Sequence, residues 1–257
     1  MSILQNKNMK IQTFIFVHDQ NIILDYINVG KFKDLPNLKF VFVGDKSVDK
    51  VKNLDNVIIC RELPINIEKY PKFTSLTGWY ALWKNNLIDA DYINLFEYDL
   101  TISSEFTELL NDTVKSKPDF IGYIPRPISM FDYVSNFMWV KDIMPSIKKH
   151  YDINIFDIID NIKSKNPSEV WSCTSNSTFS ISTFEEYMEW FDKLIDDLKN
   201  SDTCGHAHER SISFFYFIHN KNVVMIPDVI THFQLDSHKT QGHFVDFDNS
   251  MKNLLSN

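Results

Sequence analysis

The sequence predicts an α/β protein with a mostly parallel central sheet and helices on both faces. Two observations favour this class. Short runs rich in β-branched and aromatic residues alternate with helix-like segments through the first hundred residues. The strand-like runs are apolar throughout, which is typical of strands that are buried on both faces.

The elements of the first half follow in regular order. The expected strands are the runs at 11–19, 38–45, 56–63 and 91–103. A helix is expected at 21–30, where Gly30 ends the helical spacing. A second helix, at 73–88, has Thr74 or Ser75 as a candidate N-cap. Its apolar residues lie on one helical face and are assigned to the core: Leu76, Trp79, Tyr80, Trp83 and Leu87.

The second half is less regular. Strands are expected at 119–128, leading into a Pro-rich loop, at 170–182, and at 222–230. Helices are expected at 183–200 and at 208–220, and a polar, His-rich tail follows from 231. Because no linker-like break separates the halves, we expect a single domain over 1–257.

Composition limits the function. The formal net charge of -8 argues against broad nucleic-acid binding, which needs a basic face. Three widely spaced cysteines (Cys60, Cys173 and Cys204) favour neither a disulfide framework nor a zinc knuckle, and fit a reducing compartment. No run of about 18 apolar residues occurs, so we expect no integral membrane segment and a cytoplasmic location.

Polar residues end three of the expected strands: His18 and Asp19, Gly44 and Asp45, and Glu97 to Asp99. The carboxyl ends of parallel strands meet at one edge of a sheet, where ligands bind. Three such ends on one edge favour a binding site more than any one of them would.

Glu97 and Asp99, in the stretch FEYD, are the most informative of these residues. On an extended segment, residues i and i+2 point the same way, so both carboxylates could face one cation. Oxygen ligands suit Mg or Mn. A solvated loop after a strand would explain the same pair.

The chain resembles the GT-A fold glycosyltransferases in the order of three features: a βαβ region, the helix GWYALWKN and an apolar strand ending in FEYDL. The resemblance covers the chain from about Lys10 to His243. In that family a DxD motif holds a divalent metal against the diphosphate of a sugar nucleotide. The resemblance implies Mn or Mg, a nucleotide-sugar donor such as a uridine diphosphate sugar, and a nucleotide-binding half at about 10–103 before an acceptor-side half at about 104–245. Glu97 stands for the first Asp of the motif, and Asp99 matches its last acid.

The run GHAHERSISFFYFIHN resembles the acid-bearing element of capsular-polysaccharide-type bacterial and viral transferases. In inverting members this acid removes the proton of the acceptor hydroxyl, which implies Glu209 as the base. At a helix N-terminus the carboxylate would stay ionised. An ion pair with Arg210 or a purely stabilising role are the alternatives, and His206 and His208 could compete for the base role or shape the acceptor pocket.

The tail after the last strand carries further candidates. The same resemblance implies that His232 completes the metal shell, and Lys239 could meet phosphate oxygens. His232, His238 and His243 do not have the tight spacing of a zinc site. A solvated polar tail is the alternative.

Two further stretches could recognise sugar. Hydroxyl, amide and aromatic groups gather in WSCTSNSTF, at Trp171, Thr174, Ser175, Asn176 and Ser177. Core packing and turn formation would explain the same residues. Arg126, Asp132 and Tyr133 could approach the ligand from YIPRPISMFDY, although Pro-Arg-Pro is equally typical of a stiff surface loop.

The leading hypothesis is a metal-dependent glycosyltransferase of polysaccharide biosynthesis that moves a sugar to a glycan or other hydroxyl acceptor. The nucleotide would be contacted by His18, Asp19, Asp45 and Lys239. The metal would be bound by Glu97, Asp99 and His232. Glu209 would be the base of an inverting reaction. A retaining outcome stays open. The alternatives are a non-catalytic binding module for sugars or sugar nucleotides, and a sugar nucleotidyltransferase, which would need a Gly-rich, basic loop that FVHDQNIIL lacks.

Overall fold

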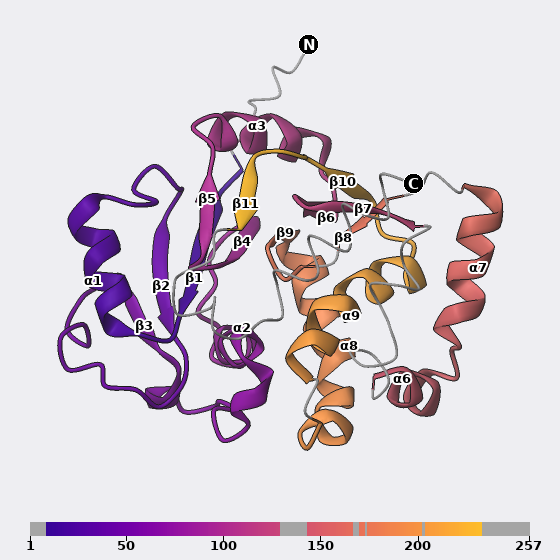
Figure 1. Ribbon diagram of the computed structural model, residues 1–257, viewed down its shortest axis with the longest axis horizontal. Coiled ribbons are helices and arrows are strands. Elements are labelled where there is room, and N and C mark those ends of the chain that lie inside the picture. Colours follow the sequence, from indigo (N-terminus) through magenta and orange to yellow (C-terminus); the bar gives the residue numbers. More distant parts are fainter. Residues whose placement is uncertain (1–8, 129–142, 167–169, 173, 202–203, 233–257) are drawn as a thin grey trace, which may run out of the picture.

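A seven-stranded sheet forms the centre of the protein (Figure 1). The computed structural model describes residues 9–128, 143–166, 170–172, 174–201 and 204–232. The strand order is β10 (Val223–Met225), β6 (Phe120–Gly122), β9 (Ser177–Ser180), β4 (Tyr92–Glu97), β1 (Ile11–Val17), β2 (Leu38–Phe42) and β3 (Val57–Ile59). Only β9 runs antiparallel to its neighbours in this sheet. The prediction of a mostly parallel sheet is confirmed.

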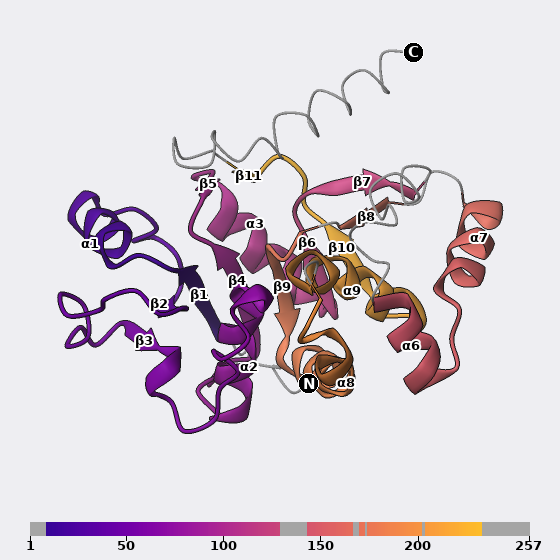
Figure 2. The same cartoon turned by 60° about the horizontal axis from the view of Figure 1, so that its bottom comes forward.

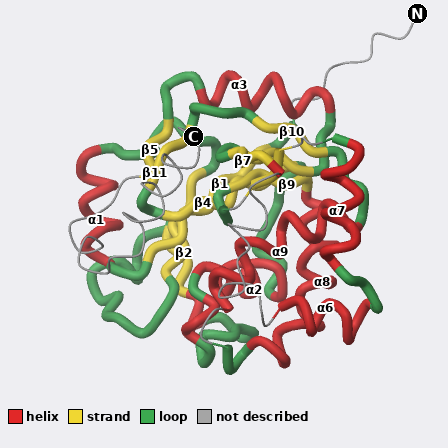
Figure 3. Tube along the Cα trace, turned by 45° about the vertical axis from the view of Figure 1, so that its right-hand side comes forward, coloured by secondary structure: helices red, strands yellow, loops and turns green. Residues whose placement is uncertain are grey.

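Helices cover both faces of the sheet, as predicted. One face carries α1 (Gln20–Val29) and α3 (Phe106–Thr113). The other face carries α2 (Ser75–Lys84), α8 (Ile181–Leu198) and α9 (Cys204–Ile218). Figure 3 shows α2, α8 and α9 gathered on one side of the strands, with α3 on the opposite side. The helices α6 (Ile143–Tyr151) and α7 (Ile155–Lys165) pack outside α8 and α9 (Figures 1 and 2).

The first strand shows how the two cores arise. All seven residues of β1 are buried, and successive side chains point to opposite faces. Phe14 and Phe16 enter the core under α2, whereas Ile15 and Val17 enter the core under α1. Helix α2 lies close to β1 because Gly78 has no side chain: a Cβ there would lie 2.5 Å from the Phe16 ring.

A chain of buried hydrogen bonds crosses the middle of the sheet. The Asn94 amide donates to the Thr13 hydroxyl at 2.9 Å and accepts from the Thr178 hydroxyl at 2.5 Å. The Tyr123 hydroxyl lies 2.5 Å from that of Thr178. These groups come from β1, β4, β9 and the residue after β6, so they hold four strands in one register.

Helix α1 ends at Gly30 as predicted, whereas its N-cap was not predicted. Asp19 is the N-cap, and its carboxylate accepts from the backbone N–H of Asn21 at 2.9 Å. Gly30 follows the helix with φ 66°, a left-handed conformation that favours glycine. The prediction for α2 is only partly right: Thr74 occupies the N-cap position but makes no side-chain capping bond.

Three predicted strands are each divided into two. The predicted strand at 91–103 forms β4 and β5 (Leu100–Ile102), and the one at 170–182 contains β8 (Val170–Ser172) and β9. The predicted strand at 222–230 contains β10 and leads into β11 (Ile230–His232). One piece of each pairs outside the central sheet: β5 with β11, and β8 with β7 (Pro125–Pro127). Helices α3, α6 and α7 and the 3-10 turn at Cys60–Glu62 were not predicted.

Within the described residues, no helix combines the length and apolar character needed to cross a membrane.

Candidate active site

The three predicted strand ends lie at the same edge of the sheet. Strand β1 ends at Val17, beside Phe42 of β2, and Phe16 pairs with Glu97 at the end of β4. The loops after these strands begin with His18, Val43 and Tyr98. The sequence therefore placed this edge correctly.

The turn after β4 is anchored to the α1 side of the sheet. Glu97 is the last residue of β4, and Tyr98 and Asp99 form the turn before β5. The Tyr26 hydroxyl donates to the Tyr98 carbonyl at 2.9 Å, and the His18 ring makes an edge contact with the Tyr98 ring at 5.0 Å between centroids. The extended geometry expected for Glu97 and Asp99 is therefore wrong, because Asp99 lies in a turn.

Glu97 is held by residues from two other segments. Its backbone N–H donates to the Asn176 side-chain oxygen at 2.7 Å, and its carboxylate accepts from the Ser175 hydroxyl at 3.2 Å. The Ser75 hydroxyl, at the start of α2, donates to the same carboxylate. The loop before β9 and the start of α2 thus fix the direction of the Glu97 side chain.

The electrostatic surroundings of Glu97 favour its neutral form. Burial raises the pKa of the Glu97 carboxyl to about 7, and the charges of Asp99 and Glu209 add to the rise, although the Ser75 and Ser175 hydrogen bonds oppose it. A carboxyl group with a pKa near neutrality binds a proton or a cation readily. The same interactions place Asp99 and Glu209 each within electrostatic range of Glu97.

Asp99 also interacts with the α1 side of the protein. Burial lowers the pKa of the Lys31 amine to about 8, and the Asp99 charge acts against this decrease. The Asp99 charge also contributes to the raised pKa of Tyr26, about 12, after the larger effect of burial. Among the described residues, no group of three His, Cys, Asp or Glu side chains has the geometry to hold a metal ion.

Glu209 lies in α9 and faces a strong counter-charge. Its carboxylate pairs with the neighbouring Arg210 guanidinium and lies 3.7 Å from His206 Nδ1. Burial alone would raise the pKa of Glu209, but Arg210 and His206 outweigh it and lower the pKa to about 2. The ion pair with Arg210, given above as an alternative to the base role, is therefore present, and the carboxylate is ionised at neutral pH.

The predicted reason for that ionisation is wrong. Helix α9 begins at Cys204, four residues before the expected start, so its first turn contains no acid. Glu209 lies beyond the first turn, where the effect of the helix dipole is weak. Within this first turn Gly205 packs closely against the Lys72 carbonyl and Thr74: a Cβ there would lie 3.1 Å from the carbonyl oxygen.

His208 is a core residue and does not compete for the base role. It is fully buried, and its ring packs edge-on against Trp79 at 4.6 Å and Phe191 at 5.7 Å. Neither ring nitrogen makes a hydrogen bond within the described part of the chain. Burial lowers the pKa of His208 to about 3, so the ring is neutral at physiological pH.

Replacing His208 with Phe should reduce the sensitivity of the protein to acid. Between pH 6.5 and about 3 the unfolded chain protonates this residue while the folded protein does not, so the free energy of unfolding decreases as the pH falls. At pH 4 the contribution is roughly 3 kcal/mol. Urea unfolding from pH 7 to pH 4 should show a flatter pH dependence for H208F, and parallel curves for both proteins would contradict the assignment.

The β1 and β2 loops are joined by charges at this edge. Lys46 pairs with Asp19 at 3.3 Å, and the Asn21 hydrogen bond, with Lys46, lowers the pKa of Asp19. Asp19 is therefore largely engaged as the α1 N-cap. Asp45 is exposed and open to solvent at the end of β2.

A group around Gly44 was not predicted. Gly44 has φ 93° and open space around its Cβ position, so conformation and not crowding requires glycine there. Its N–H donates to Glu68 Oε2 at 2.7 Å, and Arg61 donates to the Gly44 and Lys46 carbonyls at 3.0 and 2.7 Å. The buried Glu68 Oε1 atom makes no hydrogen bond among the described residues. Nothing local in the sequence marks Arg61 or Glu68.

The other predicted sugar-contacting residues divide into two groups. Ser175 and Asn176 lie at the edge and contact Glu97, whereas Trp171 is buried in the core and Ser177 is buried in β9. Arg126 lies in β7, opposite Trp171.

The backbone of His232 lies beside the turn that carries Asp99. Strand β11 pairs with β5, and His232 is opposite Leu100, the residue after Asp99. The remaining tail and loop candidates lie outside the described residues: Asp132, Tyr133, Lys239, His238 and His243.

Comparison with known proteins identifies the fold. No family model matches the sequence, and no curated protein matches it. Among solved structures, the bifunctional glycosyltransferase WbbM in its apo form matches with a TM-score of 0.61. This chain shares its fold with part of that glycosyltransferase. The match covers 88% of this chain and 46% of the WbbM chain at 14% identity, so the fold described here corresponds to less than half of that chain.

Proposed function

We propose that this protein is a metal-dependent glycosyltransferase that uses a nucleotide-sugar donor. The observation that carries the proposal is the convergence of Glu97, Asp99 and Glu209 at the carboxyl edge of a glycosyltransferase fold. These acids lie at the sheet edge where ligands bind. The pKa of Glu97 is raised and that of Glu209 is lowered, and displaced pKa values of this kind are typical of a functional site.

The residues present fit a divalent cation. Asp99 and Glu97 offer carboxylate oxygens, and a cation between them would offset the repulsion that contributes to the raised pKa of Glu97. The position of the His232 backbone supports its assignment as a third ligand. When bound, Mn or Mg supplies charge compensation for a departing nucleoside diphosphate. Ser75 and Ser175 hold the Glu97 side chain at the edge.

The nucleotide is assigned to the loops after β1 and β2. His18, Asp19 and Asp45 border this area, and Lys239 is proposed to contact phosphate. Glu68 is added to this set, because its unpaired buried oxygen beside Gly44 can accept a hydrogen bond from a ribose hydroxyl or a base N–H.

Glu209 is proposed as the base that receives the proton of the acceptor hydroxyl. While it is paired with Arg210 its proton affinity is low, because a pKa of about 2 is far from neutrality. The base role therefore requires Arg210 to turn from Glu209 toward the diphosphate in the ternary complex. A non-catalytic binding module is the second candidate, because the same ion pair would suit a structural carboxylate.

Thermal unfolding with nucleoside diphosphates and their sugars, with and without Mn, tests the proposal. A ligand that binds only the folded state should add about 2.7 kcal/mol at 100 times its dissociation constant. We expect this gain for one nucleotide and only when Mn is present. Absence of a gain with every nucleotide, or an equal gain without metal, would contradict metal-dependent donor binding.

A further inference from the structure

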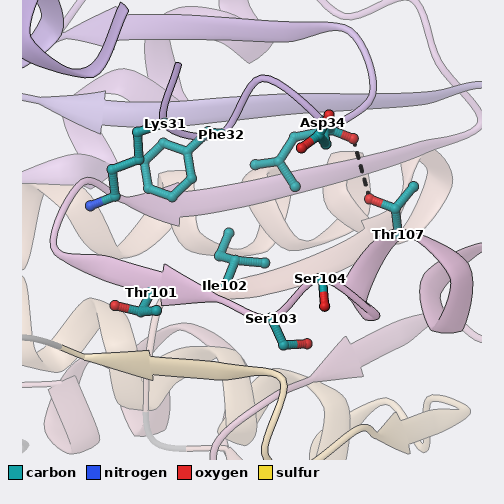
Figure 4. Close-up of a pocket in the computed structure, with 9 residues that line it drawn as sticks. Lys31, Phe32, Asp34, Thr101, Ile102, Ser103, Ser104 and Thr107 are labelled. Carbon is teal, nitrogen blue, oxygen red and sulfur yellow. Dashed lines mark hydrogen bonds between the residues drawn. The ribbon is translucent and has the colours of Figure 1, made fainter. Parts of the chain in front are cut away.

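A cavity lies between the segment after α1, strand β5 and the start of α3 (Figure 4). Its volume of about 510 Å³ is within the range of small-molecule sites, roughly 300–1,000 Å³. We call it the α1–α3 cavity. Residues between Lys31 and Leu35 form one wall, and residues from Thr101 to Thr107 form the other.

Hydroxyl groups dominate the second wall of the cavity. They belong to Thr101, Ser103, Ser104 and Thr107. The Thr107 hydroxyl donates to the Asp34 carbonyl at 3.3 Å, as Figure 4 shows. The Ser103 hydroxyl oxygen is buried and has no hydrogen-bond partner among the described residues. A buried hydroxyl without a partner is unusual, so a ligand that supplies one would be favoured.

The first wall presents an aromatic ring from a strained backbone. Phe32 has φ 66°, which is uncommon for a bulky residue. Its ring contacts Tyr26 edge-on, with 5.5 Å between centroids, and lines the cavity. Strained residues of this kind cluster at ligand sites. Leu35 and Ile102 add apolar surface.

The charges around the cavity favour a neutral ligand. The amine of Lys31, 4.7 Å from the Phe32 ring centroid, shares the cavity with the carboxylate of Asp34. Two more acids, Glu105 and Glu108, lie at the start of α3 and are exposed. A polyanion would be repelled by these three carboxylates. Hydroxyl groups, one aromatic ring and a lining in which the Lys31 amine offsets the Asp34 carboxylate fit an uncharged molecule with many hydroxyl groups and an apolar face.

We infer that the α1–α3 cavity binds a neutral sugar unit of the glycan on which the enzyme acts. The identity of the ligand rests on the proposed function, because that function supplies the glycan. The position agrees with it: Thr101 follows Asp99 by two residues, and Lys31 lies within the field of Asp99. The cavity therefore borders the segment that carries Asp99.

Saturation-transfer NMR on the full chain tests this inference with the methyl glycosides of glucose, galactose and N-acetylglucosamine, and with pyrophosphate as the anionic probe. At least one glycoside should bind, and pyrophosphate should not displace it.

Phe32→Gly removes the ring and relieves the strained φ, and T101V/S104A removes two hydroxyls with little change in packing. Each variant should weaken the apparent affinity roughly tenfold, whereas Val29→Ala, at an exposed site on α1, should leave it unchanged.

Urea unfolding of each variant separates lost binding from lost folding. If Phe32→Gly is unfolded, T101V/S104A decides alone. Equal glycoside binding by the wild type and T101V/S104A, binding by none of the glycosides, or displacement by pyrophosphate would overturn the inference. Glycoside binding that persists while no nucleotide binds with Mn would contradict the proposed function and leave the sugar site supported.

Discussion

Replacing Asp99 with Asn should remove stabilisation by Mn and nucleotide together and lower turnover at least about a hundredfold, which corresponds to about 2.7 kcal/mol of activation free energy. Asn keeps the size of the side chain but removes the charge that a cation would need. A metal ion supplies several kcal/mol of charge stabilisation in such reactions. The measurements are sugar transfer from the donor found by thermal unfolding, and Mn titration followed by the same unfolding assay.

The Asp99 variant also has an internal check that does not depend on activity. Loss of the Asp99 charge should lower the pKa of Glu97 from about 7, since this charge contributes to its rise. It should also lower the pKa of Lys31, which the same charge supports. Asp160→Asn, at an exposed site on α7, is the matched control and should behave like the wild type. Full Mn-dependent stabilisation of D99N would refute the metal assignment.

Replacing Glu209 with Gln should abolish transfer while donor binding is kept. General bases contribute about 10²–10⁴ to rates, and a loss in this range is expected. Gln cannot accept the proton but keeps the length of the side chain. Glu189→Gln, at an exposed site on α8, is the matched control. Turnover should be measured under single-turnover conditions, and donor affinity by the Mn-dependent thermal shift.

The pH dependence of the wild type distinguishes the roles of Glu209. With Arg210 beside it, the pKa of about 2 keeps the carboxylate charged in the free enzyme over the whole physiological range. The acidic limb of kcat/KM, which reports the free enzyme, should therefore not come from Glu209. If Arg210 turns away in the ternary complex, an acidic limb should appear in kcat and vanish in E209Q. Undiminished turnover of E209Q would refute the assignment of Glu209 as the base.

The sequence predicted those parts of the fold that depend on local pattern. The apolar runs of β1, β2 and β4 and the Gly30 that ends α1 are marked by neighbouring residues, so these elements could be anticipated. The division of 91–103 into β4 and β5 could not, since β5 exists only because β11, more than a hundred residues later, pairs with it.

The candidate site was predicted less completely for the same reason. Glu97 and Asp99 stand out because acids end an apolar strand. Ser75 and Glu68 carry no such mark, and their significance comes from contacts with Glu97 and Gly44 across 22 and 24 residues of chain. His208 looked like a polar site residue beside Glu209, but the helical turn directs it toward Trp79.

The hydrogen-bonded chain from Thr13 through Asn94 and Thr178 to Tyr123 limits how this protein can change. It fixes β9 against β4, and the residue before β9, Asn176, binds the backbone of Glu97. A slip of one residue would leave Asn94 without its partners and separate Asn176 from Glu97. New substrate preferences in relatives of this chain should therefore arise by exchange of the loops beyond the strand ends, with these four polar residues retained.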